Sequence, residues 1–165
     1  MKTNNYIARG EGADRFEKLP ISIYEKPADA VKAVAQEIAE LIRTKATKNE
    51  QCVLGLATGS SPIKLYQELV RMHKEEGLSF RNVVTFNLDE YLPMPKESEQ
   101  SYHYFMHHHL FDHIDIDPAN IHIPDGTLHK EQIEEFCKNY EKAIEAAGGL
   151  DIQILGIGRT GHIGF

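Results

Sequence analysis

Apolar residues follow two alternating patterns along this chain. Short unbroken apolar runs are typical of buried strands, and apolar residues repeated every three or four positions are typical of amphipathic helices. The runs predict strands over 21–24, 51–56, 82–86 and 151–155, with a brief strand or connector over 121–124. The repeats predict helices that open at Lys26-Pro27, follow Pro62, and cover 98–114 and 128–147. This alternation predicts right-handed crossovers and a parallel sheet.

Each predicted helix carries one apolar face. Pro27 suits a first helical turn, and glycines at 77 and 148–149 predict the ends of the second and fourth helices. The residues expected on the core-facing sides are Val31, Val34, Ala35, Ile38, Leu41 and Ile42, then Leu65, Tyr66, Leu69 and Val70, then Tyr104, Leu110 and Phe111, and finally Ile133, Phe136, Cys137, Tyr140 and Ile144.

These elements predict an α/β fold with a doubly wound, Rossmann-like, mostly parallel sheet and helices on both faces. Residues 1–19 are polar and aperiodic, which predicts an N-terminal arm, and residues 20–165 predict part of a single domain. The last predicted strand is followed by a glycine-rich turn and no helix. We therefore expect the chain to be the N-terminal part of a domain that continues beyond Phe165.

The composition is that of a globular protein, and it narrows the range of partners. The chain has 165 residues, of which 41% are hydrophobic and 26% charged, and its formal net charge is −7. An acidic chain without a basic run is poorly suited to nucleic acid. No apolar run approaches the ~20 residues of a membrane span, and no secretory signal is visible. Cys52 and Cys137 are far apart, so we expect no disulfide framework and a cytoplasmic location.

Three loops with candidate chemistry follow predicted strands, where open α/β sheets bind ligands. In the first loop, Gly59 lets the backbone approach a ligand, and the helix after Pro62 favours a phosphate at its N-terminus. The hydroxyls of Thr58, Ser60 and Ser61 can donate hydrogen bonds to it. An ordinary turn capped by Ser or Thr is the alternative. The Gly-Lys-Ser/Thr of a nucleotide-binding P-loop is absent.

The second loop places Asp89 and Glu90 directly after a buried strand. Partial burial raises the basicity of a carboxylate and suits it to removing a proton next to a carbonyl or imine. A pair of solvated loop acids is the alternative.

The third loop, over residues 156–165, contains four glycines and His162. Glycines permit a tight backbone path, and a histidine titrates near neutral pH. The G-x-G-x-x-G beginning at Gly156 is not a dinucleotide fingerprint, because no helix and no ribose-binding acid follow it. The alternative for His162 is a loop histidine bonded to the backbone.

Two further features are weaker candidates for chemistry. The histidines at 103, 107, 108, 109 and 113 have no HExxH spacing and no nearby cysteine, so we expect a partly exposed helix rather than a metal site. Cys52 lies within a predicted strand and is expected to be small core filler rather than a nucleophile.

Four separated segments together resemble the glucosamine-6-phosphate deaminase family of amino-sugar isomerase-deaminases. They are LGLATGSSPIKLYQELV, VVTFNLDEYLPM, ESEQSYHYFMHHHLFDHIDI and GIGRTGHIGF, and the likeness runs from about Ile21 to the end. The resemblance implies conversion of glucosamine 6-phosphate and water to fructose 6-phosphate and ammonia, with no metal and no organic cofactor. It also implies a small amino-sugar phosphate as the partner and a homo-oligomer when the protein is full length.

The resemblance also implies a role for individual residues. Asp89 matches the general base that moves the C2 proton to C1 through an enolamine. His162 matches the histidine that shuttles a proton to the ring oxygen and opens the sugar ring. The loop of Thr58, Gly59, Ser60 and Ser61 matches the one that holds the sugar phosphate.

The chain departs from the family pattern in two places. Thr160 stands where family members often have an acid that orients the histidine. Thr160 can donate or accept a hydrogen bond, so it is the candidate for orienting His162 in catalysis. The chain ends just before an Asn-Glu-Pro that the family pattern leads us to expect. The 165 residues therefore lack the acid of the ring-opening relay and the later basic residues. We therefore expect these 165 residues alone to be inactive or severely impaired.

Two other functions remain open from the sequence. A 6-phosphogluconolactonase has a similar fold, but it usually carries Asp-Glu-Arg where this chain has Asp89-Glu90-Tyr91, and Thr-Ala after its Gly-His pair where this chain has Ile-Gly. A non-catalytic sugar-phosphate sensor would keep the anion loop and lose the chemistry, and Thr160 is the feature that hints at it.

Overall fold

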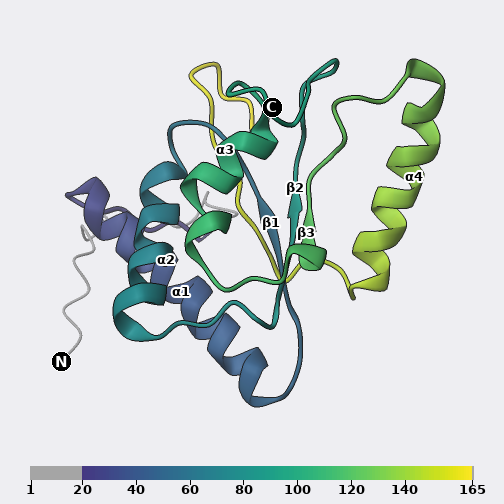
Figure 1. Ribbon diagram of the computed structural model, residues 1–165. Helices are drawn as coiled ribbons and strands as arrows, with labels where there is room; N and C mark the ends of the chain where they lie inside the picture. Colours follow the sequence, from purple (N-terminus) through teal and green to yellow (C-terminus); the bar gives the residue numbers. More distant parts are fainter. Residues whose placement is uncertain (1–19, 165) are drawn as a thin grey trace.

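The computed structural model describes residues 20–164, so the predicted arm over 1–19 lies outside the described residues (Figure 1). In this part of the chain one parallel sheet has four strands in the order β3-β2-β1-β4. The strands are β1 Cys52–Leu56, β2 Val83–Asn87, β3 Ile121–His122 and β4 Ile152–Gln153. The helices are α1 Pro27–Thr47, α2 Ile63–Glu76, α3 Tyr102–His109 and α4 Lys130–Ala146, with short 3-10 helices at Phe111–His113 and Pro118–Asn120.

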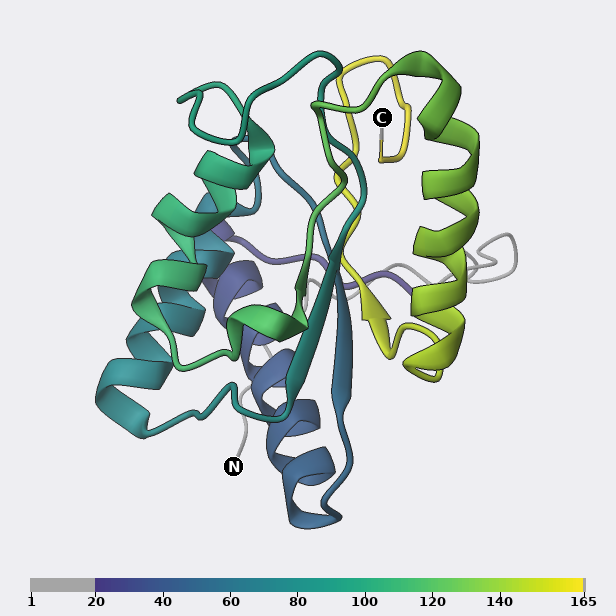
Figure 2. The same ribbon diagram turned by 45° about the vertical axis from the view of Figure 1, so that its right-hand side comes forward.

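The sheet is covered on both faces, which confirms the doubly wound prediction. Helices α1, α2 and α3 lie on one side of the strands and α4 lies on the other (Figures 1 and 2). Successive strand side chains alternate between the two layers. Leu54 and Leu56 of β1 pack in the larger cluster with α1 and α2, whereas Val53 packs with Val84 and Phe86 against α4.

Helix α1 forms where its spacing predicted it. Lys26 is the N-cap residue and Pro27 opens the first turn. The stripe that reaches the core is narrower than predicted, because Ala35, Ile38, Ala39 and Ile42 are buried whereas Val34 is 43% exposed. The prediction for Val34 is therefore wrong, since this side chain lies beside the helix–sheet contact and lines a cavity instead.

Helix α2 begins and ends as predicted, with Leu65, Tyr66 and Leu69 buried against the sheet. Gly77 has φ +66° and stops the helix in the left-handed conformation that glycine adopts readily. The hydroxyl of the fully buried Tyr66 donates to the carbonyl of Ala57, which anchors the base of the loop after β1.

Helix α3 is shorter than the predicted 98–114. It begins after Ser101, whose hydroxyl accepts the N–H of Tyr104 at 2.9 Å. It ends at His109, because the next residue, Leu110, has a φ of −139° and a ψ of −65°, which break the helix before a 3-10 turn. Leu110 and Phe111 are buried as predicted, but Tyr104 is 40% exposed and was wrongly assigned to the core face.

Two predicted strands change in the structure. Residues 21–24 are not a strand: they make no sheet pairing, and Ile21 and Ile23 remain exposed. The prediction failed because an apolar run becomes a strand only where a partner backbone is available. The last strand covers only 152–153 of the predicted 151–155, and Asp151 secures its start by accepting the Val53 N–H and pairing with Lys45 at 2.7 Å.

Helix α4 lies on the smaller cluster and is less covered than its sequence pattern suggests. None of its residues is fully buried, and Cys137, which was predicted on the core face, is exposed. Tyr140 is the main anchor, since its hydroxyl donates toward the carbonyl oxygens of Asn87 and His122 at 2.9 and 3.0 Å. The helix ends at two glycines with positive φ, as predicted.

No helix within residues 20–164 combines the length and the apolar character that crossing a bilayer requires.

The stability of this fold is expected to fall as the pH drops from 7.5 to 5.5. His122 stacks on Phe86 with ring centroids 4.4 Å apart, and burial lowers the pKa of His122. The unfolded chain therefore binds the proton more tightly, so stability declines once the pH falls below the unfolded value of about 6.5. We expect protonation of this group to lower the thermal midpoint. Differential scanning fluorimetry at both pH values measures the shift.

His122→Gln is expected to show a smaller pH-dependent loss than the wild type. Some loss should persist, because burial also lowers the pKa of His103 and His109. The exposed His113→Gln is the matched control for removing one imidazole. An equal loss in the wild type and in His122→Gln contradicts the prediction.

Candidate active site

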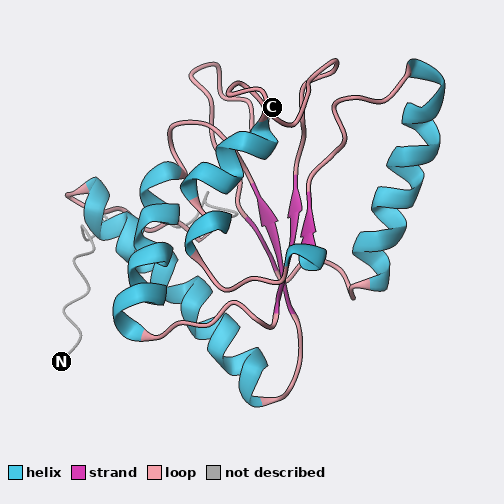
Figure 3. Ribbon diagram, viewed as in Figure 1, coloured by secondary structure: helices cyan, strands magenta, loops and turns pink. Residues whose placement is uncertain are grey.

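The loops after β1, β2 and β4 meet at the carboxyl edge of the sheet, as predicted (Figures 2 and 3). Two adjoining cavities open between them, a larger one of 480 Å³ and a smaller one of 120 Å³. The walls that both cavities share are Ala57, Thr58, Gly59, Gly156 and Gly164. A ligand at this edge can therefore touch the first and third loops at once.

The loop after β1 has the form of an anion site. Gly59 has φ +102°, which places its backbone in a conformation that other residues rarely adopt. Pro62 is the N-cap residue of α2, and within the described residues no side chain caps this helix end. The alternative of a turn capped by Ser or Thr is thus not found. The N–H groups of the first turn are left to a ligand, and the helix dipole favours an anionic one.

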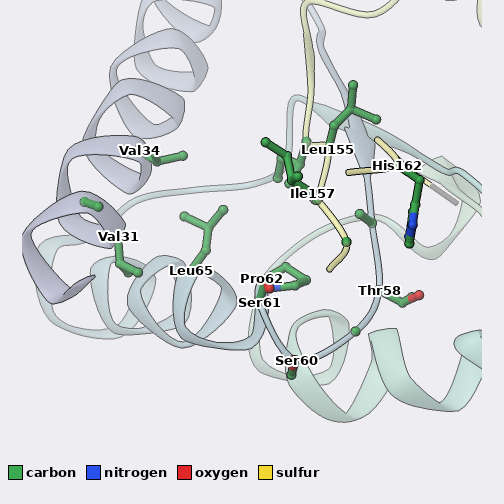
Figure 4. Close-up of a pocket in the computed structure, with 17 residues that line it drawn as sticks. Val31, Val34, Thr58, Ser60, Ser61, Pro62, Leu65, Leu155, Ile157 and His162 are labelled. Atoms are coloured by element: carbon green, nitrogen blue, oxygen red, sulfur yellow. The ribbon is translucent and has the colours of Figure 1, made fainter. Parts of the chain in front are cut away.

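Hydroxyl side chains surround this helix end. Thr58, Ser60 and Ser61 all line the larger cavity, with Thr58 half-buried and the two serines exposed (Figure 4). Neither cavity is lined by Lys or Arg among the residues that the structure describes. The donors available here for a phosphate are therefore neutral hydroxyl and N–H groups.

Asp89 is a half-buried acid in the smaller cavity, beside Thr58 and Gly156. Burial raises the pKa of Asp89, and the negative charge of Glu90 raises it further. The group is consequently a stronger base than a solvated aspartate. Glu90 is not a free loop acid either, because its carboxylate accepts three backbone N–H groups. The alternative of two solvated acids is therefore wrong.

His162 is exposed and reaches the larger cavity from a tight hairpin-like loop (Figure 4). Ile157 and Ile163 form an isolated antiparallel bridge, and the Gly158 N–H donates to the His162 carbonyl at 2.9 Å. A Cβ atom at Gly158 would overlap the imidazole of His162, so a larger residue at this position would displace the ring. The ring bonds to a side chain rather than to the backbone, with Nδ1 2.9 Å from the Thr160 hydroxyl.

The sequence interpretation missed Tyr102. This residue is the first of α3, and its side chain lines the smaller cavity with Asp89. Burial raises the pKa of Tyr102 to about 12, and the centroid of its ring lies 4.8 Å from that of Tyr91. The available signal was Ser101, an N-cap residue that would have started the helix here and brought Tyr102 to the carboxyl edge.

The other residues considered as candidates, the histidines around α3 and Cys52, lie away from these cavities. Within residues 20–164, no three His, Cys, Asp or Glu side chains come together in a way that could hold a metal ion. His108, His109 and His113 line a separate hollow with α2. Cys52 is fully buried in β1, which confirms it as core filler, and burial raises the pKa of its thiol to about 12.

Comparison with known proteins adds a family and several relatives. The family described as glucosamine-6-phosphate isomerases/6-phosphogluconolactonase matches residues 25–164. Glucosamine-6-phosphate deaminase of Thermoanaerobacter sp. is 49% identical over 132 residues, which are 80% of this chain and 51% of the relative. Glucosamine-6-phosphate deaminase 2 of Giardia intestinalis is 46% identical over 160 residues, which are 96% of this chain and 58% of the relative.

Solved structures share this fold. A monomeric glucosamine-6-phosphate deaminase superposes with a TM-score of 0.78 at 41% identity, over 85% of this chain and 56% of that chain. A 6-phosphogluconolactonase from Thermotoga maritima superposes with a TM-score of 0.65 at 27% identity, over 81% of this chain and 58% of that one. The chain thus spans about half the length of the proteins it matches.

Proposed function

Because the chain belongs to the glucosamine-6-phosphate isomerases/6-phosphogluconolactonase family, we propose that it carries part of the active site of a glucosamine-6-phosphate deaminase. The reaction is the conversion of glucosamine 6-phosphate and water to fructose 6-phosphate and ammonia. It combines an aldose–ketose isomerisation with hydrolysis of a C–N bond.

One arrangement carries this proposal. An acid with a raised pKa, Asp89, and a histidine, His162, occupy adjoining cavities around a single anion loop. A phosphate at the N-terminus of α2 would leave the carbon chain of a sugar to extend along the shared wall toward both groups. The deaminase chemistry needs one proton carrier for ring opening and another for C2, and these two side chains supply them.

Ring opening comes first, because only the open chain has a carbonyl at C1 that makes the C2 proton acidic. His162 delivers a proton to the ring oxygen as the bond from that oxygen to C1 breaks, and the C1 hydroxyl returns a proton to the imidazole, which leaves the aldehyde. Thr160 holds the imidazole through Nδ1, which leaves Nε2 to face the substrate. The orientation of the ring is thereby set by a neutral hydroxyl.

Isomerisation and release of ammonia follow. Asp89 takes the C2 proton, and the electron pair of that bond forms the C1–C2 double bond while the C1 carbonyl π bond breaks and its oxygen takes a proton, which gives an enolamine. The same carboxyl group then returns a proton to C1 as the nitrogen lone pair forms the double bond to C2. The product is an imine at C2, to which water adds, and ammonia leaves as the C2 carbonyl forms. A carboxylate of raised basicity is suited to the first step, since its pKa lies closer to the working pH.

The lactonase alternative is less well supported. The chain is 46% and 49% identical to two deaminases but 27% identical to the Thermotoga maritima lactonase. Tyr91 is 54% exposed where a lactonase usually places arginine, so no guanidinium is available at that position. The sensor alternative rests on Thr160 alone.

The test is a direct assay of the full-length protein with glucosamine 6-phosphate, measuring ammonia and fructose 6-phosphate together. Equal release of both supports the proposal. Hydrolysis of 6-phosphogluconolactone without ammonia release from the amino sugar would assign the lactonase reaction instead. Binding of glucosamine 6-phosphate, measured by calorimetry, without turnover of either compound would assign a sensor.

Location and assembly complete the proposal. The thiols of Cys52 and Cys137 are free, which fits a reducing compartment such as the cytoplasm. The expected homo-oligomer stays a prediction, and one structural relative is described as monomeric. Light scattering on the full-length protein measures its mass in solution.

A further inference from the structure

The loop that carries Asp89 is fastened to α3 by one carboxylate, that of Glu90. Its Oε1 accepts the N–H of Tyr102 at 3.0 Å, and its Oε2 accepts the N–H of His103 at 2.9 Å. Oε1 also accepts the N–H of Tyr91 at 2.9 Å, within the loop itself. Because both oxygens act only as acceptors, the ionised carboxylate is the form that fits.

The same contacts determine where α3 begins. The first residues of a helix have N–H groups without a partner inside the helix. Glu90 takes the first two, and Ser101 takes the third through the N–H of Tyr104. A negative charge at this end also interacts favourably with the helix dipole. The position of the helix end therefore depends on a residue 12 positions earlier in the chain.

Two side chains of the smaller cavity flank this contact. Asp89 precedes Glu90 in the loop, and Tyr102 is the first residue of the helix, and both line the 120 Å³ cavity. Glu90 does not line it: its side chain borders a separate cavity of 280 Å³ on the side of α4. Glu90 can therefore affect the reaction only through neighbouring groups, without touching the smaller cavity itself.

We propose that Glu90 is a positioning residue of the reaction, which fixes Asp89 relative to Tyr102 by tying the loop after β2 to the N-terminus of α3. The inference rests on the proposed function. One carboxylate must reach both C2 and C1 of the substrate, so its place relative to the cavity wall limits the rate. Displacements of about 1 Å at such a group can cost about 10²-fold in rate.

Glu90 also acts on Asp89 through its charge. The two carboxylates repel each other, and this repulsion adds to burial in raising the pKa of Asp89. The other titratable groups around this pair are Tyr91, Tyr102 and His103, with Lys96, Glu97 and His107 beyond His103. Removing the charge of Glu90 should therefore lower the pKa of Asp89, whereas shortening the side chain should chiefly loosen the loop.

Two variants separate charge from reach, and both are assayed in the full-length protein. Glu90→Gln removes the charge and one of the acceptor oxygens, and we expect kcat to fall about 10–100-fold with KM within about threefold. The acid limb of the pH profile of kcat/KM should move to lower pH, because protonation of Asp89 then requires more acid. Glu90→Asp keeps the charge but is one methylene shorter, so kcat should fall with a smaller displacement of the limb.

Glu99→Gln is the matched control, since Glu99 is an exposed acid farther along the same loop between β2 and α3 and loses the same charge. It should retain the wild-type kcat and pH profile. A Glu90→Gln variant with a lower thermal midpoint but unchanged kcat and unchanged acid limb would overturn the inference. If Glu90→Gln does not fold, the wild-type kcat in Glu90→Asp would overturn it equally.

The coupling between Glu90 and Asp89 can also be tested without any enzymatic turnover. If the wild-type protein releases no ammonia, the Asp89 carboxyl can be titrated directly by carbon NMR, with its signal assigned through Asp89→Asn. A lower midpoint in Glu90→Gln supports the coupling that Glu90 imposes on Asp89. An unmoved midpoint overturns it, whatever the substrate.

Discussion

Replacing Asp89 with asparagine is expected to lower the rate of ammonia release from glucosamine 6-phosphate by about 10²–10⁴-fold. Asparagine has nearly the same shape, so the loop after β2 and the small cavity should persist, but its amide cannot accept the C2 proton. The loss should appear in kcat with little change in the binding of the sugar phosphate, because the contacts proposed for the phosphate lie on the loop at 58–61, which lines the larger cavity.

Isotope exchange makes this test specific for the proton transfer. In heavy water, the protonated carboxyl of Asp89 can exchange its proton for deuterium before it returns one to C1, so the wild-type enzyme should place some deuterium at C1 of fructose 6-phosphate, and Asp89→Asn should not. The wild-type acid limb of kcat/KM should lie above the ordinary aspartate pKa of about 3.9, because burial and Glu90 raise the pKa of Asp89. Asp112→Asn, an exposed acid outside both cavities, is the control. Deuterium incorporation at the wild-type rate by Asp89→Asn would exclude it as the base.

Truncating Ile38 to alanine is expected to lower the free energy of unfolding by about 2–5 kcal/mol. Ile38 is 1% exposed and lies in the larger cluster, where α1 packs on the sheet. Removing its side chain beyond Cβ loses the favourable free energy of moving these apolar atoms out of water. It also leaves a void that the close-packed neighbours fill only in part. Since a domain is stable by only about 5–15 kcal/mol, this loss is a large share of the total.

Val34→Ala provides the matched control on the same helix, one turn earlier. Val34 is 43% exposed, so its truncation should cost less than about 1 kcal/mol. Urea unfolding followed by circular dichroism gives both values. Equal losses in the two variants would mean that the packing of α1 on the sheet is not as described.

The chain's local patterns were enough to predict the order of its main elements. The helical repeat around Ile38 and the apolar run at 52–56 each report which side of an element is buried, and such periodicity belongs to the element itself. Gly77 could be identified as a helix stop for the same reason, because its left-handed conformation is a local property. The carboxyl-edge positions of Asp89 and the loop at 58–61 then followed from the parallel topology.

Features that depend on a distant partner could not be predicted in this way. The predicted start of α3 was wrong because the acceptors for its first N–H groups include Glu90. This residue is 12 and 13 positions away from the two helix residues that it binds. Residues 21–24 resemble a strand in composition, but no strand is adjacent to pair with them. Tyr102 was missed because its place in the cavity depends on where α3 begins.

The amino-acid sequence by itself determined the order of the main strands and helices, most of their apolar sides, and which loops carry acids, hydroxyls and histidine. Only the tertiary structure decided that Asp89 and Tyr102 share a cavity, that Glu90 holds the loop to a helix end, and that α4 is only partly covered. The physical reason is that hydrophobic periodicity is a local property of each element. Hydrogen-bond satisfaction and burial depend on which distant groups the fold brings within reach.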